Sequence, residues 1–348
     1  MNNTVLICDD SAMARKQMIR ALPQDWGMSL ATAVDGNDCL AQLRQGRGDL
    51  LFLDLNMPIL DGYQVLEAIR REDLPTIVIV VSADIQPLAR RRVMALGALA
   101  FVKKPLDATE LVQLLNEYGF YPSEPGRKPK QGVQNPPPFQ TATTLSQQSG
   151  ALSWQEALQE VANIAMGQAG DHLARLLGVF VELPVPRVSE IEASELHMAL
   201  ADSACHDHSA AVCQGFIGGG ITGEVILLFS DSSSTDMARL LGYPPQTDSQ
   251  QNQEVLLDMS SILAGAFLNG ISEQLSNPFS ITPPDVLGHH LSIPKLLEQH
   301  SSRWQRMLAI ELNYRIESHG IRCDLLLLMT GQSLPALQHK LAYLVDPL

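Results

Sequence analysis

The sequence predicts two folded domains of different class. Residues 1–120 are expected to form a doubly wound α/β domain with a five-stranded parallel sheet, and residues 150–348 an α+β domain built from an internal duplication. Three observations support this: strand-like apolar runs alternate with amphipathic stretches up to about residue 118, a proline-rich segment follows, and the remainder repeats itself at a fixed offset. The chain therefore divides into domains at 1–120 and 150–348, joined by a linker at 121–149.

The first domain is predicted from five short apolar runs. A parallel sheet covered on both faces by helices requires strands that are apolar on both sides, so its strands lack polar alternation. The runs are Val5–Cys8, Leu30–Val34, Leu50–Leu53, Ile77–Val81 and Ala100–Val102.

Residues 121–149 have the composition of a linker. The segment is rich in Pro, Gln, Ser and Thr, so it lacks the apolar residues needed for a core. A flexible segment of about 30 residues spans roughly 30 Å and gives the domains that it joins a mutual concentration on the order of millimolar.

The duplication after the linker can be checked by subtraction. An offset of 98 relates five positions of the first copy to five of the second, and an offset of 100 relates residues 223–229 to residues 323–329. Each copy is expected to contain a long helix (about 153–178 and 251–276), a Pro-containing turn, β-strands and a shorter helix. The paired positions are Glu156, Glu160, Asn163, Pro186 and Val188 with Glu254, Asp258, Ser261, Pro284 and Val286.

Composition excludes several classes of function. The 348 residues carry a formal net charge of −14, which argues against a dedicated nucleic-acid binder. No uninterrupted apolar run reaches the ~20 residues of a bilayer span, and the N-terminus lacks the basic and apolar regions of a secretory peptide, so we expect a cytoplasmic protein without membrane insertion. The five scattered cysteines are expected to be free thiols.

Polar residues follow the predicted strands of the first domain, and we expect them to form one pocket. Asp9 and Asp10 follow the first strand, Asp54 the third, Ser82 the fourth, and Lys104 the fifth. The carboxyl ends of parallel strands share one edge of the sheet, which is where ligands bind in open α/β folds. Crowded carboxylates need a cation, and oxygen ligands suit Mg²⁺.

These residues resemble the receiver domain of two-component response regulators, a flavodoxin-like fold, over residues 1–120. The resemblance implies that Asp54 is phosphorylated by a histidine kinase or its phosphorylated partner, and that a cis peptide joins Lys104 to Pro105. It also implies that Asn56 and Asp84 tune the lifetime of the phosphate. The implied Mg²⁺ ligands are Asp9, Asp10, Asp54 and the backbone carbonyl of Asn56, and the implied switch and charge-neutralising residues are Ser82, Phe101 and Lys104.

A second group of polar residues lies on the first long helix of residues 150–348. Glu160 and Asn163 are three residues apart and Glu156 lies one turn earlier, so all three project from one face. A carboxylate can pair with a lysine, and a carboxamide can hold a water. The alternative is an ordinary amphipathic helix.

This pattern, with 22 residues between Asn163 and Pro186, resembles the CheC/CheX family of chemotaxis phosphatases. The resemblance implies that Asn163 positions a water for attack on a phosphorylated CheY-type receiver while Glu160 pairs with the partner's lysine, and that Glu156 and Pro186 support them. In the second copy Asp258 and Ser261 replace the acid and the amide ahead of Pro284, so we expect an inactive centre.

Three functional hypotheses follow. The leading one is a response regulator in which phosphorylation of Asp54 controls a phosphatase for phosphorylated receivers. The alternative is a non-catalytic adaptor or phosphate sink, and a third is hydrolysis in cis at phospho-Asp54. The sequence leaves open whether phosphorylation activates or inhibits, and whether the chain is a homodimer.

Weaker motifs are interpreted structurally. The glycine-rich residues 215–223 are expected to form a β-hairpin turn, because no Lys-Ser/Thr pair follows them. Cys205, His206, Asp207, His208 and Cys213 lack zinc-site spacing, and His289-His290 is expected in a loop. The triplet Arg90–Arg92 is interpreted as a solvated helix face, with a partner-binding surface as the alternative.

Overall fold

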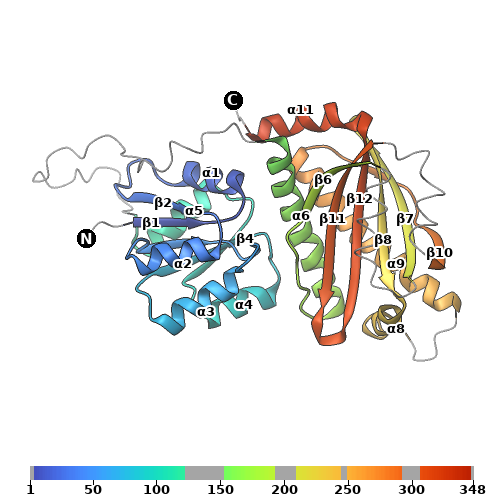
Figure 1. Ribbon diagram of the computed structural model, residues 1–348, viewed down its shortest axis with the longest axis horizontal. Coiled ribbons are helices and arrows are strands. Elements are labelled where there is room, and N and C mark those ends of the chain that lie inside the picture. The colour runs from blue at the N-terminus through green and yellow to red at the C-terminus, as the bar shows by residue number, and fades with distance from the viewer. Residues whose placement is uncertain (1–3, 122–152, 193–208, 244–248, 292–305, 346–348) are drawn as a thin grey trace, which may run out of the picture. The chain divides into compact units, whose positions relative to one another are not determined.

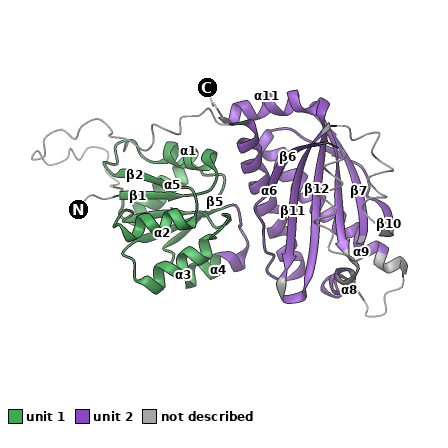
Figure 2. Cartoon of the chain, in the orientation of Figure 1, with its two compact units in different colours: residues 1–82, 90–153 green, residues 83–89, 154–348 purple. Residues whose placement is uncertain are grey.

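A computed structural model describes residues 4–121, 153–192, 209–243, 249–291 and 306–345 (Figure 1). The chain separates into two compact units (Figure 2): unit 1 contains residues 1–82 and 90–153, and unit 2 contains residues 83–89 and 154–348. The proposed linker lies outside the described residues, apart from Tyr121.

Unit 1 is a five-stranded parallel sheet of order β2-β1-β3-β4-β5. This arrangement confirms the expected doubly wound α/β class, and all five predicted strands are present to within one residue at their ends. The strands are β1 (Thr4–Cys8), β2 (Ser29–Ala33), β3 (Leu50–Leu53), β4 (Ile77–Ser82) and β5 (Ala100–Lys103). The helices are α1 (Ala12–Ala21), α2 (Gly36–Arg44), α3 (Gly62–Glu72), α4 (Pro87–Ala95) and α5 (Ala108–Glu117).

Local signals fix the helix starts of unit 1. Asp61 caps α3 in a capping box with Gln64, and Asp107 caps α5. Such caps satisfy backbone N–H groups that have no partner in the helix. Because these caps stand directly after the loops that follow β3 and β5, they also fix the loops that carry the polar residues.

In the residues that the structure describes, unit 2 is an antiparallel sheet with four α-helices. The strand order is β10-β7-β8-β12-β11-β6, with β9 paired to β7. The strands are β6 (Arg187–Glu192), β7 (Ser209–Gly218), β8 (Ile221–Ser230), β9 (Ser280–Ile281), β10 (Asp285–Leu291), β11 (Arg306–Ile316) and β12 (Ile321–Thr330). The helices are α6 (Trp154–Leu177), α8 (Asp231–Leu240), α9 (Ser249–Leu275) and α11 (Leu334–Val345), with short 3-10 turns η2 (Glu317–His319) and η3 (Gly331–Ser333).

The sheet of unit 2 has the symmetry of a duplication. The strand order is unchanged when β6, β7 and β8 are exchanged with β10, β11 and β12. At the centre, β8 pairs with β12 so that Ile226 lies opposite Leu326, its own counterpart 100 residues later. The two copies therefore meet about a local two-fold axis, and the long helices α6 and α9 pack together.

One expectation about unit 2 is corrected, and one of its helices bears on another. Residues 253–275 of α9 are long and apolar enough to cross a membrane by length and composition. Leu263, Phe267 and Ile271 are fully buried, so this segment is the core helix of the unit. His289 and His290 lie in β10 and not in a loop, because pairing with β7 through an irregular register around Gly288 extends the strand past them.

Candidate functional site

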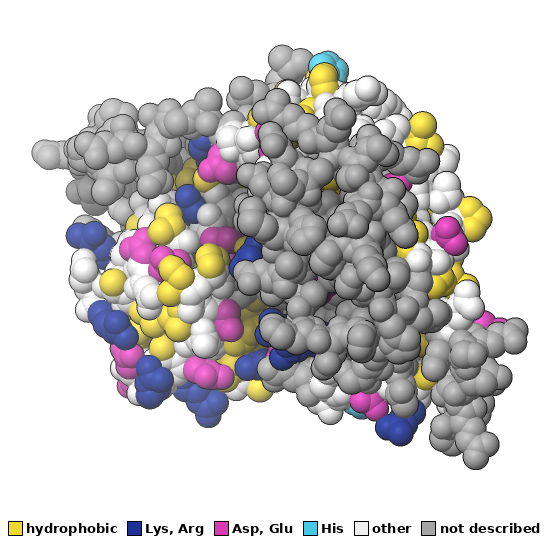
Figure 3. Space-filling view, turned by 45° about the vertical axis from the view of Figure 1, so that its right-hand side comes forward, with side chains coloured by type: hydrophobic (Ala, Val, Ile, Leu, Met, Phe, Trp, Pro, Cys, Tyr) yellow, Lys and Arg dark blue, Asp and Glu magenta, His cyan; other side chains and the backbone are white. Residues whose placement is uncertain are grey.

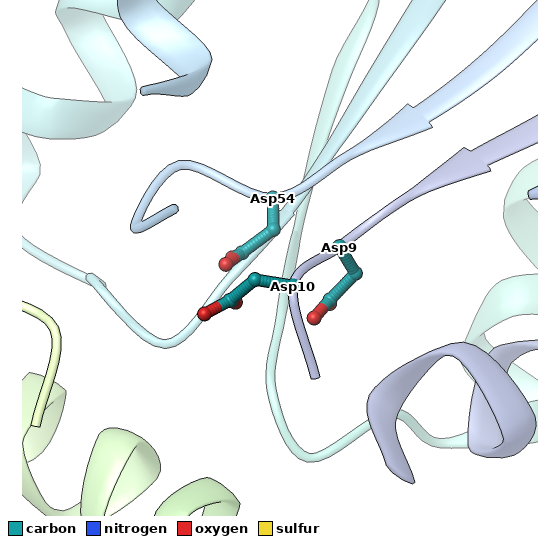
Figure 4. A group of neighbouring side chains, drawn as sticks. All are labelled: Asp9, Asp10 and Asp54. Carbon is teal, nitrogen blue, oxygen red and sulfur yellow. The ribbon is translucent and has the colours of Figure 1, made fainter. Parts of the chain in front are cut away.

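Three carboxylates meet at the carboxyl edge of the unit 1 sheet (Figure 4). Asp9 and Asp10 leave the end of β1, and Asp54 leaves the end of the neighbouring strand β3. The N–H of Asp54 donates to the carbonyl of Cys8 at 2.9 Å, which keeps the two strand ends level. One oxygen of each carboxylate lies within 4.8 Å of the others. Asp9 and Asp54 are buried, at 5% and 1% exposed, whereas Asp10 is half-buried.

Lys104 supplies a positive charge to this cluster. Its Nζ lies 2.7 Å from Oδ2 of Asp9 and 3.5 Å from Oδ1 of Asp54. All three side chains are nearly inaccessible, so desolvation opposes the ionised forms and the close pairing offsets it. The expected cis peptide between Lys104 and Pro105 is present.

The remaining predicted residues surround the same edge. Ser82, the last residue of β4, is fully buried, and Asp84 is 2% exposed. Asn56 is half-buried, and its Nδ2 has no hydrogen-bond partner among the described residues. Phe101 is half-buried in β5, opposite Val80 of β4. Asn56 therefore carries an available donor two residues after Asp54.

Sequence reasoning missed Arg15, which holds the backbone of the two N-terminal acids. Its Nη1 donates to the carbonyl of Asp9 at 2.7 Å and to that of Asp10 at 3.1 Å. Arg15 is only 9% exposed. The available signal was a basic residue in the first turn of α1, immediately after an acidic pair.

The thiol of Cys8 lies beside the site and is buried. It contacts Cys39, the sulfur of Met57 at 3.5 Å and the carbonyl of Asp35 at 3.4 Å. The hydrogen bond with Cys39 and burial raise the pKa of Cys8 far above its ordinary value, so it stays protonated. All cysteines among the described residues are free, as expected.

In unit 2, the predicted polar residues lie along one face of α6. Glu160 is 2% exposed and Asn163 is 5% exposed, whereas Glu156 is exposed near the start of the helix. Oδ1 of Asn163 has no hydrogen-bond partner among the described residues. Pro186 is buried directly before β6. A buried acceptor without a hydrogen-bond partner destabilises the protein. A ligand or water that donates a hydrogen bond to Oδ1 of Asn163 would therefore bind favourably.

The equivalent residues of the second copy, Asp258 and Ser261, have different hydrogen-bond partners and are exposed. The hydroxyl of Tyr243 donates to Oδ2 of Asp258 at 3.0 Å, and this bond raises the pKa of Tyr243. The hydroxyl of Ser261 donates to the carbonyl of Leu257 in its own helix at 2.9 Å. Both side chains are exposed on α9. Pro284 again stands just before a strand, β10.

The weaker motifs resolve as follows. The glycine-rich segment is the predicted hairpin between β7 and β8, with Gly219 and Gly220 at positive φ in the turn. Cys213 lies in β7. Residues 205–208, the rest of the weighed metal motif, lie outside the described residues.

Comparison with known proteins identifies the first unit. A family model described as the response regulator receiver domain matches residues 5–116. This range contains the acid cluster, Lys104, Ser82 and Asn56. Residues 5–116 are a response regulator receiver domain.

Curated relatives that match the chain carry different names. Over 110 residues the chain is 39% identical to a protein-glutamate methylesterase/protein-glutamine glutaminase of Koribacter versatilis, covering 31% of this chain and 30% of that protein. Over 108 residues it is 37% identical to the transcriptional regulatory protein PrrA of Mycobacterium bovis, covering 31% and 46%. The matches thus span a third to a half of these relatives and reach only the receiver domain.

Two solved structures also match. The chemotaxis protein CheY4 of Vibrio cholerae matches 34% of this chain and 98% of its own, at 28% identity and a TM-score of 0.31. FliY of Thermotoga maritima matches 56% of this chain and 98% of its own, at 16% identity and a TM-score of 0.42.

The acid cluster of the receiver domain fits Mg²⁺. Receiver domains bind Mg²⁺ through such a cluster, and here three carboxylate oxygens converge with no nitrogen or sulfur ligand among them. Hard oxygen donors are what Mg²⁺ prefers. Asp9, Asp10 and Asp54 would hold the ion, with the Asn56 carbonyl as the further ligand implied by the family.

We predict that Arg15→Ala weakens Mg²⁺ binding by about tenfold, because partners outside the ligand shell commonly contribute 10- to 100-fold to metal affinity. Without Arg15, the carbonyls of Asp9 and Asp10 lose the donor that orients their loop. Calorimetric titration with MgCl₂ measures the change. Arg20→Ala, an exposed residue of the same helix, serves as the control and should bind as wild type.

The arginine triplet of the receiver domain is partly structural. The guanidinium of Arg92 stacks over the ring of Tyr63 at 4.2 Å and lies 3.9 Å from Glu67, so it ties α4 to α3. Arg90 and Arg91 are exposed. Figure 3 shows acidic and basic side chains interleaved on the described surface of the molecule.

Proposed function

We propose that this chain is a response regulator in which Asp54 accepts a phosphoryl group and unit 2 dephosphorylates phosphorylated receivers of the CheY type. The observation that carries the proposal is the pair Glu160 and Asn163, held one helical turn apart on a single buried face of α6. Pro186, at the spacing of the CheC/CheX signature, supports it. Asp54, between two acids and Lys104, supports the acceptor role.

Phosphoryl transfer to Asp54 follows from the charges around it. An oxygen of Asp54 attacks the phosphorus of a phosphohistidine donor, the P–N bond breaks, and the imidazole takes up a proton as an acyl phosphate forms. Bound Mg²⁺ supplies neutralisation of the added charge. Lys104 neutralises a further phosphoryl oxygen, and the donors of Asn56 and Ser82 can bond the others.

Phosphatase action needs one oriented water and little covalent machinery, because an acyl phosphate is already labile. The carboxamide of Asn163 donates to and accepts from the water, aligning it with the phosphorus of the partner. The water attacks, the P–O bond to the partner's aspartate breaks, and inorganic phosphate leaves while the carboxylate is regenerated. Glu160 pairs with the partner's active-site lysine.

The second copy is proposed to lack this activity. The carboxylate of Asp258 is held by Tyr243, and the hydroxyl of Ser261 is bonded within its own helix. A serine hydroxyl also has a shorter stem than an asparagine amide, so it reaches less far toward a phosphorus.

One observation favours the adaptor alternative. Asn163 is only 5% exposed, and a water-positioning side chain must reach the phosphorus of a partner. A unit 2 that binds chemotaxis proteins without catalysis would not need this side chain to be accessible, and residues 1–120 would then act as a phosphate sink.

We predict that Asn163→Ala lowers hydrolysis of a ³²P-labelled CheY-type receiver by about 100-fold, the scale of a lost positioning group. Ser261→Ala, the equivalent change in the second copy, is the matched control and should retain wild-type hydrolysis. Release of inorganic phosphate is followed with substrate in excess.

Unchanged hydrolysis in Asn163→Ala would refute the water-positioning role. A wild-type protein that binds the labelled receiver without accelerating its hydrolysis would establish the adaptor instead. Loss of label from phospho-Asp54 at a rate independent of protein concentration would show hydrolysis in cis.

A further inference from the structure

The loop after β3 contains a backbone conformation that isoleucine disfavours. Ile59 has a φ of 72°, and the N–H of Leu60 donates to the carbonyl of Pro58 at 2.8 Å, which closes a three-residue γ-turn centred on Ile59. A γ-turn with a positive φ at its centre is rare and strained, and a β-branched side chain adds to the strain. Glycine would adopt this conformation without a steric penalty. The side chain at position 59 is therefore present against the preference of the backbone.

The rest of the loop holds Ile59 in this conformation. The N–H of Gly62, the first residue of α3, donates to the carbonyl of Leu55 at 2.9 Å, so the chain after Ile59 is anchored. A Cβ at Gly36 would lie 2.5 Å from the carbonyl oxygen of Leu60, so the loop also packs closely against the start of α2. Because the residues around Ile59 are fixed, a movement of the loop cannot relieve the strain.

The strained residue exposes its side chain near the acid cluster. Ile59 is 78% exposed, the largest exposed fraction of any large apolar side chain that the structure describes. It follows Asp54 by five residues, a span of at most about 18 Å. Val34, which is 40% exposed, directly follows β2. Since the strand order is β2-β1-β3, the two exposed side chains lie in loops on either side of the strand that leads to Asp9 and Asp10. We call Val34 and Ile59 the apolar rim.

A protein that donates a phosphoryl group must cover this edge of the sheet. Asp54 is only 1% exposed, so a donor's phosphorus reaches it only when the surrounding donor surface rests on the loops at the edge. Burial of an exposed isoleucine side chain is favourable enough to change an equilibrium constant about tenfold. Exposed apolar side chains are common, but packing within the protein does not explain one that also strains its backbone. A small phosphodonor would bury little of the apolar rim.

We infer that the apolar rim, and Ile59 above all, is the surface on which a protein carrying a phosphohistidine seats an apolar side chain of its own when it phosphorylates Asp54. The inference rests on the proposed acceptor function and adds recognition of the donor to it. The fixed γ-turn holds the Ile59 side chain in place before the donor arrives, so docking does not have to order the loop.

The test compares the labelling rates of the full-length protein with two donors. One is a ³²P-autophosphorylated histidine kinase chosen because it labels the wild type, and the other is ³²P-phosphoramidate, whose P–N bond breaks with release of ammonia. The ratio of the kinase rate to the phosphoramidate rate should fall about tenfold in Ile59→Ala and about threefold in Val34→Ala. Ile59→Met, which keeps an apolar side chain, should retain most of the wild-type ratio.

Ile77→Ala is the matched control. Ile77 is 42% exposed at the first residue of β4, at the opposite edge of the sheet, so its truncation should leave the ratio at the wild-type value. An equal fall in Ile77→Ala and Ile59→Ala would show that loss of any exposed isoleucine has this effect, and would overturn the inference.

Ile59→Gly separates the side chain from the backbone. It should lower the ratio as Ile59→Ala does, while the thermal unfolding midpoint rises by a few degrees, because the relieved strain exceeds the added freedom of glycine in the unfolded chain. An unchanged ratio in both variants would overturn the docking role, and a lowered midpoint in Ile59→Gly would overturn the strain. If phosphoramidate fails to label wild-type Asp54, the proposed acceptor function is refuted instead.

Discussion

Asp54→Asn is expected to abolish phosphoryl transfer to this chain, lowering incorporation from a ³²P-labelled phosphohistidine donor at least 1,000-fold. The carboxamide lacks the anionic oxygen that attacks phosphorus, and no other acid of the cluster has the same place at the end of β3. Incorporation is measured by gel electrophoresis of the acid-labile label with MgCl₂ present.

Asp73→Asn is the matched control for this experiment. Asp73 lies at the end of α3 with a positive φ of 49°, a conformation that Asn adopts readily, so the change should leave both folding and labelling intact. Labelling of Asp54→Asn at a rate near that of Asp73→Asn would place the acceptor elsewhere, with Asp9 and Asp10 as the remaining acids of the cluster.

Asp54→Asn should also stabilise the metal-free protein. Three carboxylates within 4.8 Å repel one another, and one lysine cannot compensate all of them. Removing one charge should raise the thermal unfolding midpoint in EDTA by a few degrees. The gain should shrink when MgCl₂ is added to wild type, since the ion performs the same neutralisation.

The receiver domain could be predicted almost fully from the sequence because its signals are local. Each strand is an apolar run that ends at a polar residue, and parallel strands bring those ends to one edge. Asp9, Asp54 and Lys104 therefore meet as expected, although they are far apart in the chain.

The duplication in unit 2 was equally visible, because a repeat offset survives when individual residues change. The offset of 100 between residues 226 and 326 even gives the pair that lies opposite at the centre of the sheet. The offset does not reveal what each copy does. The spacing of the repeat also could not predict that the hydroxyl of Tyr243 would donate a hydrogen bond to Asp258.

Contacts between a side chain and a backbone group could not be predicted. Arg15 binds the carbonyls of both Asp9 and Asp10. A backbone group is the same in every residue type, so such bonds leave no pattern in the sequence.

Gly62→Ala is expected to be the most damaging small substitution near the acid cluster. Gly62 is buried at the start of α3, and its N–H donates to the carbonyl of Leu55 at 2.9 Å. An added Cβ would collide with the backbone carbonyl of Asp54 and lie 2.8 Å from Cα of Leu55. Backbone atoms cannot rotate away as a side chain does, so the loop that follows β3 must shift.

We expect Gly62→Ala to lower the free energy of unfolding by about 3 kcal/mol, the upper range for overpacking. Urea titration measures this value, and calorimetry should show weaker Mg²⁺ binding because the displaced carbonyl belongs to Asp54. The control is Gly265→Ala in α9, where a Cβ meets nothing within 4 Å. That change should instead stabilise by about 1 kcal/mol through helix propensity. If the two substitutions have equally small effects on the free energy of unfolding, the loop after Asp54 can shift at little cost. Its geometry would then not depend on the absence of a side chain at position 62.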